Sequence, residues 1–407
     1  MAEENKDLKR TTEELTWLEN LQRNSWEPEV IISGIILAFL FAFPSKIYAF
    51  AARLIQDVGL HFVGGMLVLL YLSAIISVFK IFFVVHLALR FIWAGLLGLS
   101  YAFPQGVINK NLFKASQQYE YKKPGELVLQ MERICSMTFA YPISQVFLIL
   151  IFTVYLGFLL FIYVWLDISF AIVYLIFMVS LLGFVTMLLA KKKSRWKENF
   201  ATSMMGSVGA IYQSNLGKWF SILYGAIIMI FAMPLIYEDV KDFSMFFNET
   251  NLLEREREWP TKGLTYADFH NEESRYPRFF LPSETVESDI LRVGVARYQG
   301  DSKILIDLND QFRIQLDTMN WHELKDTPDL YRFYLDEEVI QAGTWRRSRI
   351  QVTDQKVYET TLNISELEPG IHTLRVEKVM LRYSIFSNKP EEILLRKYWD
   401  EIDFIKK

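Results

Sequence analysis

The chain has 407 residues, of which 52% are hydrophobic and 15% aromatic, and its formal net charge at neutral pH is -4. This length predicts two or three structural units, and the nearly balanced charge gives no reason to expect a nucleic-acid partner. The sequence holds one cysteine, Cys135, which excludes an intramolecular disulfide. We interpret Cys135 as a small apolar residue buried near a helix start.

Residues 1–29 are polar and lack the apolar core of a cleavable signal peptide. Thr11 and Glu14 have the spacing of a capping box, and leucines recur around them at helical intervals. We therefore predict a cytoplasmic amphipathic helix. Its apolar face is expected either to pack on the protein's own cytoplasmic helices or to lie on the membrane or on a partner.

Long apolar segments follow, and each exceeds the roughly 20 residues that cross a hydrocarbon core about 30 Å thick. They cover residues 30–52, 59–79, 139–166, 168–190 and 216–237. The third and fourth are separated only by Asp167, so they predict a tight helical hairpin. We expect a membrane domain over residues 30–237, with cytoplasmic helical extensions over 80–138 and 191–216.

Basic residues in short loops orient the helices, because cytoplasmic loops are enriched in Lys and Arg. The loop before the last span contains the positive-inside anchors Lys191, Lys192, Lys193, Arg195 and Lys197. The region before the third span holds Lys110, Lys114, Lys122, Lys123 and Arg133, whereas the turn at Asp167 has no basic residue. Both basic loops should be cytoplasmic, which places everything after residue 237 outside.

The segment 80–103 is as apolar as a span but contains His86 and Arg90, which lie four residues apart on one helix face. A central Arg costs at least ~2.5–3.5 kcal/mol on insertion scales. If the segment crosses, there are six spans and the N-terminus is external. If it does not, there are five spans and the N-terminus is cytoplasmic. We favour five spans, with this segment continuing the second span to or along the cytoplasmic surface.

His86 and Arg90 form the candidate polar site of the membrane domain. One interpretation is a cytoplasmic-side contact to an anion or a lipid headgroup, since guanidinium matches phosphate geometry. The other is that the side chains merely reach toward the interface. A second candidate is a face of small residues before the last span, which would pack helices together or line a pore. Its members are Gly206, Gly209, Ala210 and Gly217.

Residues 238–288 are charged and interrupted by prolines, which predicts an extracytoplasmic juxtamembrane linker. From residue 289 onward apolar and polar residues alternate, as is typical of half-buried strands. The expected strands cover residues 291–300, 303–308, 311–317, 330–336, 345–352, 356–364, 372–386 and 398–406. About eight short antiparallel strands over 289–407 predict an extracytoplasmic all-β sandwich domain.

Residues 362–379, LNISELEPGIHTLRVEKV, place a Leu-x-Pro-Gly turn before an alternating strand. This passage resembles the loop-to-strand passage of immunoglobulin-like and fibronectin type III-like sandwiches. It departs from that pattern after the turn, where Ile371 stands in place of the usual aromatic residue. The resemblance implies that the sandwich is immunoglobulin-like.

The sequence shows no nucleotide-binding, serine hydrolase or zinc protease signature, and its five histidines share no metal-ligand spacing. We therefore expect a protein that is not an enzyme and has no metal or cofactor. The leading hypothesis is a bacterial inner-membrane scaffold or complex subunit that presents a periplasmic β-sandwich to another envelope component. The alternative is an oligomeric channel or transport component, with the sandwich as an external gate or cap. The expected partners are the lipid bilayer, a protein bound to the sandwich and, in the alternative, further copies of the chain.

Overall fold

A computed structural model of the chain describes residues 26–166, 168–189, 195–217, 219–241, 243, 262–271, 276–321, 324–384 and 388–407. The chain divides into two compact units. The first comprises Met1–Phe43, Ala74–Val154 and Lys192–Pro234, and the second comprises Pro44–Ser73, Tyr155–Lys191 and Leu235–Lys407. The helix predicted within residues 1–29 lies outside the described residues as far as residue 25.

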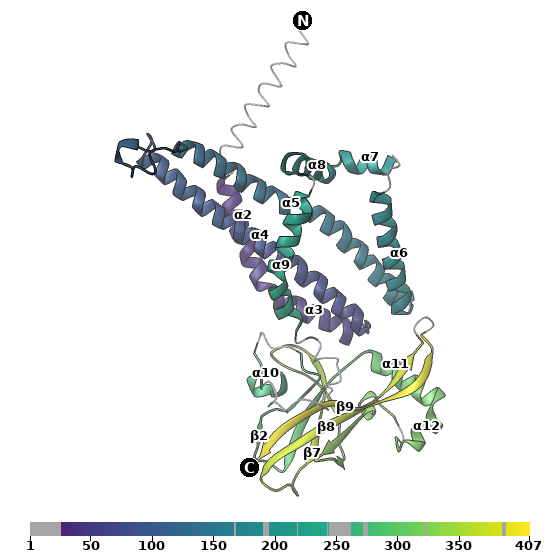
Figure 1. Cartoon of the computed structure of the whole chain (residues 1–407). Coiled ribbons are helices and arrows are strands. Elements are labelled where there is room, and N and C mark those ends of the chain that lie inside the picture. Colours follow the sequence, from purple (N-terminus) through teal and green to yellow (C-terminus); the bar gives the residue numbers. More distant parts are fainter. Residues whose placement is uncertain are drawn as a thin grey trace. The chain divides into compact units, whose positions relative to one another are not determined.

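Helices form most of the described part of the chain before residue 241. They are α2 (Trp26–Ala42), α3 (Pro44–Gln56), α4 (Phe62–Ala102), α5 (Pro124–Leu166), α6 (Phe170–Leu189), α7 (Arg195–Thr202), α8 (Met204–Leu216) and α9 (Phe220–Val240), with a short 3-10 turn at Asn109–Asn111 (Figure 1). The tight hairpin predicted between the third and fourth spans is confirmed, because α5 ends at Leu166 and α6 begins at Phe170. Asp167 itself lies outside the described residues.

Pro44 divides the first predicted span into two helices. Proline lacks a backbone N–H and disfavours helical geometry in the residue before it, so a helix ends there. Helix α2 ends at Ala42 and α3 begins at Pro44, with a bend of 47° between them. The segment 30–52, which was predicted to cross the membrane, is therefore not one straight helix, and it forms a span only if α2 and α3 cross together. Helix α3 is instead amphipathic, and its apolar face is buried.

The segment 80–103 continues the helix that begins at Phe62 without a break, as far as Ala102. Its neighbour is α5, because Arg90 pairs with Glu132 and the rings of Phe82 and Tyr141 lie 5.9 Å apart. Arg90 comes after Phe82 on α4, but its partner Glu132 comes before Tyr141 on α5. These two helices therefore run antiparallel here.

Four described helices are long and apolar enough to cross a membrane, namely α4, α5, α6 and α9. The pair α2 and α3 adds a fifth if it forms one bent span. These lengths and compositions are consistent with a multi-pass membrane protein.

The described part of the C-terminal region contains two β-sheets. Its strands are β1 (Phe279–Phe280), β2 (Thr285–Val286), β3 (Ile290–Ala296), β4 (Tyr331–Leu335), β5 (Glu338–Ile340), β6 (Arg346–Arg349), β7 (Lys356–Asn363), β8 (Gly370–Tyr383) and β9 (Pro390–Lys406). One sheet has the order β1-β3-β7-β6 and the other β2-β9-β8-β4-β5. All pairs are antiparallel except β2 with β9. The long β8–β9 ribbon is visible in yellow in Figure 1.

Two of the predicted strands are wrong. Residues 303–308 and 311–317 fall in helices α11 (Gly300–Gln311) and α12 (Arg313–Thr318). The alternation in KILIDL suggested a strand, but the buried positions Ile304 and Leu308 are four residues apart, which is helical spacing. The other expected strands overlap β3, β4, β6, β7, β8 and β9.

One apolar cluster joins side chains from both sheets, as in a sandwich core. Its fully buried members include Val293, Val295, Phe333, Leu362, Leu374, Val376 and Phe404. The N-terminal part of the chain therefore has several long apolar helices, and the C-terminal part is a β region with two sheets.

Candidate polar centre on helix α4

Arg90 lies at the centre of a buried ionic cluster. Its side chain is only 3% exposed, and its two terminal nitrogens meet different carboxylates. Nη1 donates to Glu132 Oε2 at 2.9 Å, and Nη2 donates to Glu29. Glu29 belongs to α2 and Glu132 to α5, so one guanidinium on α4 joins three helices. We call Arg90, Glu29 and Glu132 the Arg90 cluster.

His86 lies one turn before Arg90 and is also buried, with 1% of its surface exposed. Its ring packs on Phe139 of α5, with the ring centroids 5.1 Å apart. Within the described part of the chain, neither ring nitrogen of His86 makes a hydrogen bond of ordinary geometry, although the Cys135 backbone lies close to the ring. Arg90 Nε also lacks a partner among these residues. Such atoms are uncommon in protein interiors, because leaving one unpaired costs about 1–3 kcal/mol.

The geometry limits what the Arg90 cluster can bind. Carboxylates hold both Nη atoms, so a phosphate could engage Arg90 in a bidentate way only by displacing Glu29 or Glu132. The predicted contact of His86 and Arg90 with an anion or lipid headgroup stays a prediction. What the cluster can do as it stands is fix the register of three helices, because removing one partner from a buried ionic group is costly.

The small residues before α9 have different surroundings from one another. A Cβ atom on Gly206 would clash with the Phe200 carbonyl, so Gly206 permits the close turn from α7 into α8. Gly209 and Ala210 are exposed. Gly217 ends α8 with a φ of 102°, a backbone conformation that favours glycine. Their predicted role in helix packing or pore lining stays a prediction.

The positive-inside anchors are only partly described. Lys191, Lys192 and Lys193 lie outside the described residues. Arg195 is exposed at the start of α7, and Lys197 is half-buried in the same helix. The described histidines do not form a metal site, since no group of three His, Cys, Asp or Glu side chains is arranged to hold an ion within the described ranges.

In the second unit, the C-terminal end of α3 is fastened to the β region. The Gln56 carbonyl accepts a hydrogen bond from the backbone N–H of Gln299 at 2.7 Å. In the turn that follows, Asp57 pairs with Lys356 of β7 at 2.8 Å. The ring of Tyr48 in α3 packs edge-on against Tyr276, with the centroids 6.0 Å apart. A backbone hydrogen bond, an ion pair and an aromatic contact thus join the α3 segment to the β region.

A second buried ion pair lies inside the β region. Lys378 Nζ lies 2.8 Å and 2.9 Å from the two Asp301 carboxylate oxygens, and Tyr331 donates to Asp301 Oδ2 at 2.9 Å. The rings of Tyr298, Tyr331 and Trp399 lie 4.8, 4.9 and 5.4 Å from the ammonium. Burial lowers the pKa of Lys378, and the charge of Asp301 opposes this shift. Both side chains are only 3% exposed, so we assign the pair to the interior of the β region and not to a ligand site.

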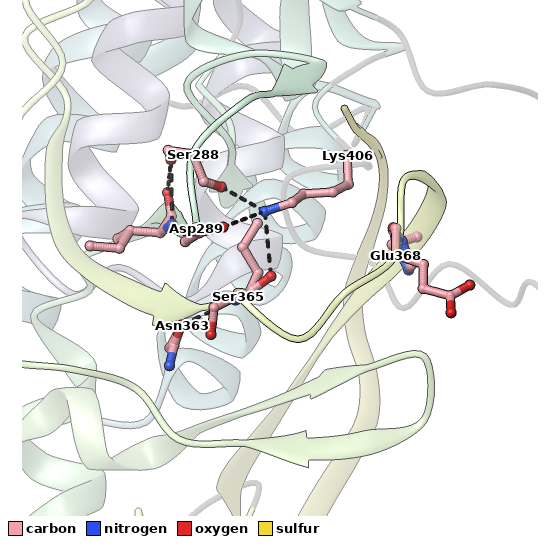
Figure 2. A network of polar contacts seen from close by, with 9 residues as sticks. Ser288, Asp289, Asn363, Ser365, Glu368 and Lys406 are labelled. Atoms are coloured by element: carbon pink, nitrogen blue, oxygen red, sulfur yellow. Dashed lines mark hydrogen bonds and ion pairs between the residues drawn. The ribbon is translucent and has the colours of Figure 1, made fainter.

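Figure 2 shows the polar contacts that the Lys406 ammonium makes between segments of the two sheets. Its ammonium donates to the Ser288 carbonyl at 3.0 Å, to Asp289 Oδ1 at 3.1 Å and to the Ile364 carbonyl at 3.5 Å. Ser288 and Asp289 precede β3, Ile364 follows β7, and Lys406 ends β9. The Lys406 side chain therefore connects β9 of one sheet to the segments that precede β3 and follow β7 in the other.

Sequence reasoning missed the partners of Arg90 and the Lys378–Asp301 pair. Glu29 lies at the edge of a predicted span and Glu132 lies in an assumed cytoplasmic extension, so neither was matched to Arg90. A signal was present, because an Arg within an apolar helix requires a partner or a cavity.

Comparison of the chain with protein-family models, with curated protein sequences and with solved structures finds no match.

Proposed function

We propose that this chain is a multi-pass scaffold or complex subunit of a bacterial inner membrane, which presents a periplasmic, immunoglobulin-like β-sandwich to another envelope component. The long apolar helices support the membrane placement. The basic loops support the orientation, because Lys and Arg concentrate on the cytoplasmic side. Two sheets sharing one core support the sandwich.

The contacts along α4 support a five-span topology with α2 and α3 as one bent span. Within the first unit, Glu29 contacts Arg90, and the Lys80 ammonium lies 5.2 Å from the centre of the Phe41 ring. Within the second unit, Gly65 leaves room for the Ile55 side chain. In the first unit the residue numbers in the bent pair fall as those in α4 rise, and the single contact in the second unit has the order that this direction requires. An odd number of spans puts the N-terminus and the β region on opposite sides of the membrane.

The observation that carries the scaffold function is the attachment of the β region to α3. The contacts Gln56–Gln299 and Asp57–Lys356 hold this region directly on the helix. A domain that presents a binding surface at a defined height above a membrane needs such an attachment, because a flexible tether would let it move freely.

The binding surface that we propose is the open edge of the second sheet. Strand β5 is its last strand, and Val339 on that strand is 60% exposed. An exposed edge strand offers unpaired backbone groups to an extended partner segment, which can add a further strand.

In-cell photocrosslinking tests this proposal. A photoreactive amino acid at position 339 should give one discrete adduct in membranes of the native host. The matched control is position 306 on α11, where Ile306 is 59% exposed but offers no strand edge. An absence of adducts at 339, or identical adducts at both positions, would count against the scaffold function.

The buried polar atoms of α4 favour the second candidate function, an oligomeric channel or transport component with the sandwich as a gate or cap. Ionisable residues inside membrane helices commonly mark an ion or substrate path. The two ring nitrogens of His86 are buried and make no hydrogen bond of ordinary geometry among the described residues. Purified protein in liposomes should then pass ions or small solutes, and His86→Phe should change that flux. A lack of flux across a panel of ions would exclude this candidate.

A further inference from the structure

The hairpin formed by α4 and α5 is longer than a membrane requires. Helix α4 has 41 residues and α5 has 43, which correspond to about 61 Å and 64 Å. Tilted by ~40°, the upper end of the usual range, α4 still rises about 47 Å, more than the ~40–45 Å of a bilayer with its headgroups. The far end of the hairpin therefore reaches at least the headgroup level.

We call residues 91–129 the distal hairpin; it comprises the end of α4, the connection and the start of α5. Its surface carries large exposed apolar side chains, although the hairpin extends to the headgroup level. Phe91 is 75% exposed and Phe113 is 87% exposed, and Ile92, Leu99, Tyr101 and Phe103 are exposed as well. Exposed apolar patches of this kind on a folded protein mark a surface that contacts something else.

The charges of the distal hairpin indicate what that contact is. Lys110, Lys114, Lys122 and Lys123 are exposed around the connection, against only two glutamates, Glu120 and Glu126. Aromatic residues beside lysines are typical of segments that lie in the membrane interface. The cytoplasmic leaflet carries anionic lipids, whose headgroups attract such basic segments.

We infer that the distal hairpin is an interfacial anchor that binds anionic phospholipid headgroups on the cytoplasmic leaflet. Its lysines face the headgroups, while Phe91 and Phe113 contact the upper acyl chains. This inference rests on the orientation given under the proposed function. It adds a second, charge-dependent attachment to a protein already held by its spans.

Spin labelling in lipid nanodiscs tests the anchor. Cys135 is fully buried, so the unmodified chain serves as the labelling blank for a Phe113→Cys variant. A nitroxide in the acyl region collides with oxygen and is shielded from a water-soluble nickel chelate. We expect its oxygen-to-nickel accessibility ratio to be several-fold above that of Ile306→Cys on α11. Adding phosphatidylglycerol to phosphatidylcholine discs should raise the ratio at 113 further.

Charge variants identify the headgroup contact. Lys110→Gln with Lys114→Gln should remove the effect of phosphatidylglycerol at position 113. Lys389→Gln with Lys397→Gln removes two exposed charges of the β region and should leave the effect intact. If Phe113→Cys does not fold, Tyr101→Cys replaces it, since Tyr101 is 78% exposed.

Two results would overturn the anchor. One is a label that is open to the nickel chelate in both lipid mixtures, which would place the hairpin in water. The other is a label shielded from both reagents and broadened by a neighbouring spin, which would mean contact between copies of the chain. Val179→Cys in the middle of α6 separates the two proposals, because a water-like label there would contradict the membrane placement itself.

Discussion

The Lys378 ammonium lies 2.8 Å from Asp301 Oδ1, and both side chains are only 3% exposed. Asp301 belongs to the helix α11 and Lys378 to the strand β8. The pair thus joins an inserted helix to β8, the central strand of the larger sheet. Because both side chains are enclosed, removing either one would leave the other as a buried group without its partner.

We predict that Asp301→Ala lowers the free energy of unfolding of the β region by about 3–5 kcal/mol, because it leaves an unpaired charge in the core. The double variant Asp301→Leu with Lys378→Met should recover most of this loss. Chemical denaturation followed by tryptophan fluorescence measures both. Lys303→Met, an exposed position on the same helix, should change stability by less than about 0.5 kcal/mol. A single variant as stable as the parent would refute this prediction.

His372 should make stability depend on pH. Partial burial lowers its pKa, but hydrogen bonds to Asp336 and to the Glu368 carbonyl outweigh this, so the net shift is upward. Nδ1 lies 2.6 Å from Asp336 Oδ2 and Nε2 lies 2.7 Å from the Glu368 oxygen, and only the imidazolium can donate to both acceptors. The nearby Lys406 acts in the opposite direction.

A folded-state pKa above the unfolded value means that protonation stabilises the fold. The contribution of His372 is fully present below its unfolded pKa of about 6.5 and is lost as pH rises through the higher folded value. We expect the melting temperature to fall over that interval, and His372→Gln to flatten the profile. Thermal scans in a pH series give the comparison, and a parent profile that rises over the same interval would contradict the assignment.

Alternation of apolar residues in the sequence predicted most of the two sheets, including β7 and β8, because these strands are long enough to show a period of two. It failed for residues 303–308, where Ile304, Leu305 and Ile306 fit both a strand and a helix. Only the burial of Ile304 and Leu308 on one face distinguishes the two. Short apolar runs lack the length that would separate these periods.

The candidate site was predicted only in part, for a related reason. Sequence spacing placed His86 and Arg90 on one helix face, which is local geometry. The carboxylates that meet Arg90 come from positions 61 and 42 residues away, and such pairing depends on how three helices pack. The sequence indicates that Arg90 requires an acidic partner, but it does not identify which acidic residue pairs with it.

We predict that Arg90→Gln destabilises the helical part of the protein by about 3 kcal/mol, because it leaves the largely buried Glu29 carboxylate and the half-buried Glu132 carboxylate without a cation. The triple variant Arg90→Gln with Glu29→Gln and Glu132→Gln should regain much of the loss. Thermal unfolding of the detergent-solubilised protein gives the ranking. Arg133→Gln, next to Glu132 but exposed, should resemble the parent, and equal effects at positions 90 and 133 would argue against the cluster.

The bent pair α2–α3 decides on which side of the membrane the chain begins. If the pair is one span, five spans separate the N-terminus from the β region, and a cysteine at position 2 should be cytoplasmic. An impermeant maleimide added to intact spheroplasts should then label Ile306→Cys in the β region but label Ala2→Cys only after the cells are opened. Cys135 is buried and gives the background. If instead the pair enters and leaves on one side, four spans remain, and both positions would be labelled in intact spheroplasts. The contact of Glu29 with Arg90 favours the first outcome. Arg90 lies 28 residues after Phe62 on α4, which is about 42 Å from the start of that helix. To make this contact, α2 must lie beside the later part of α4.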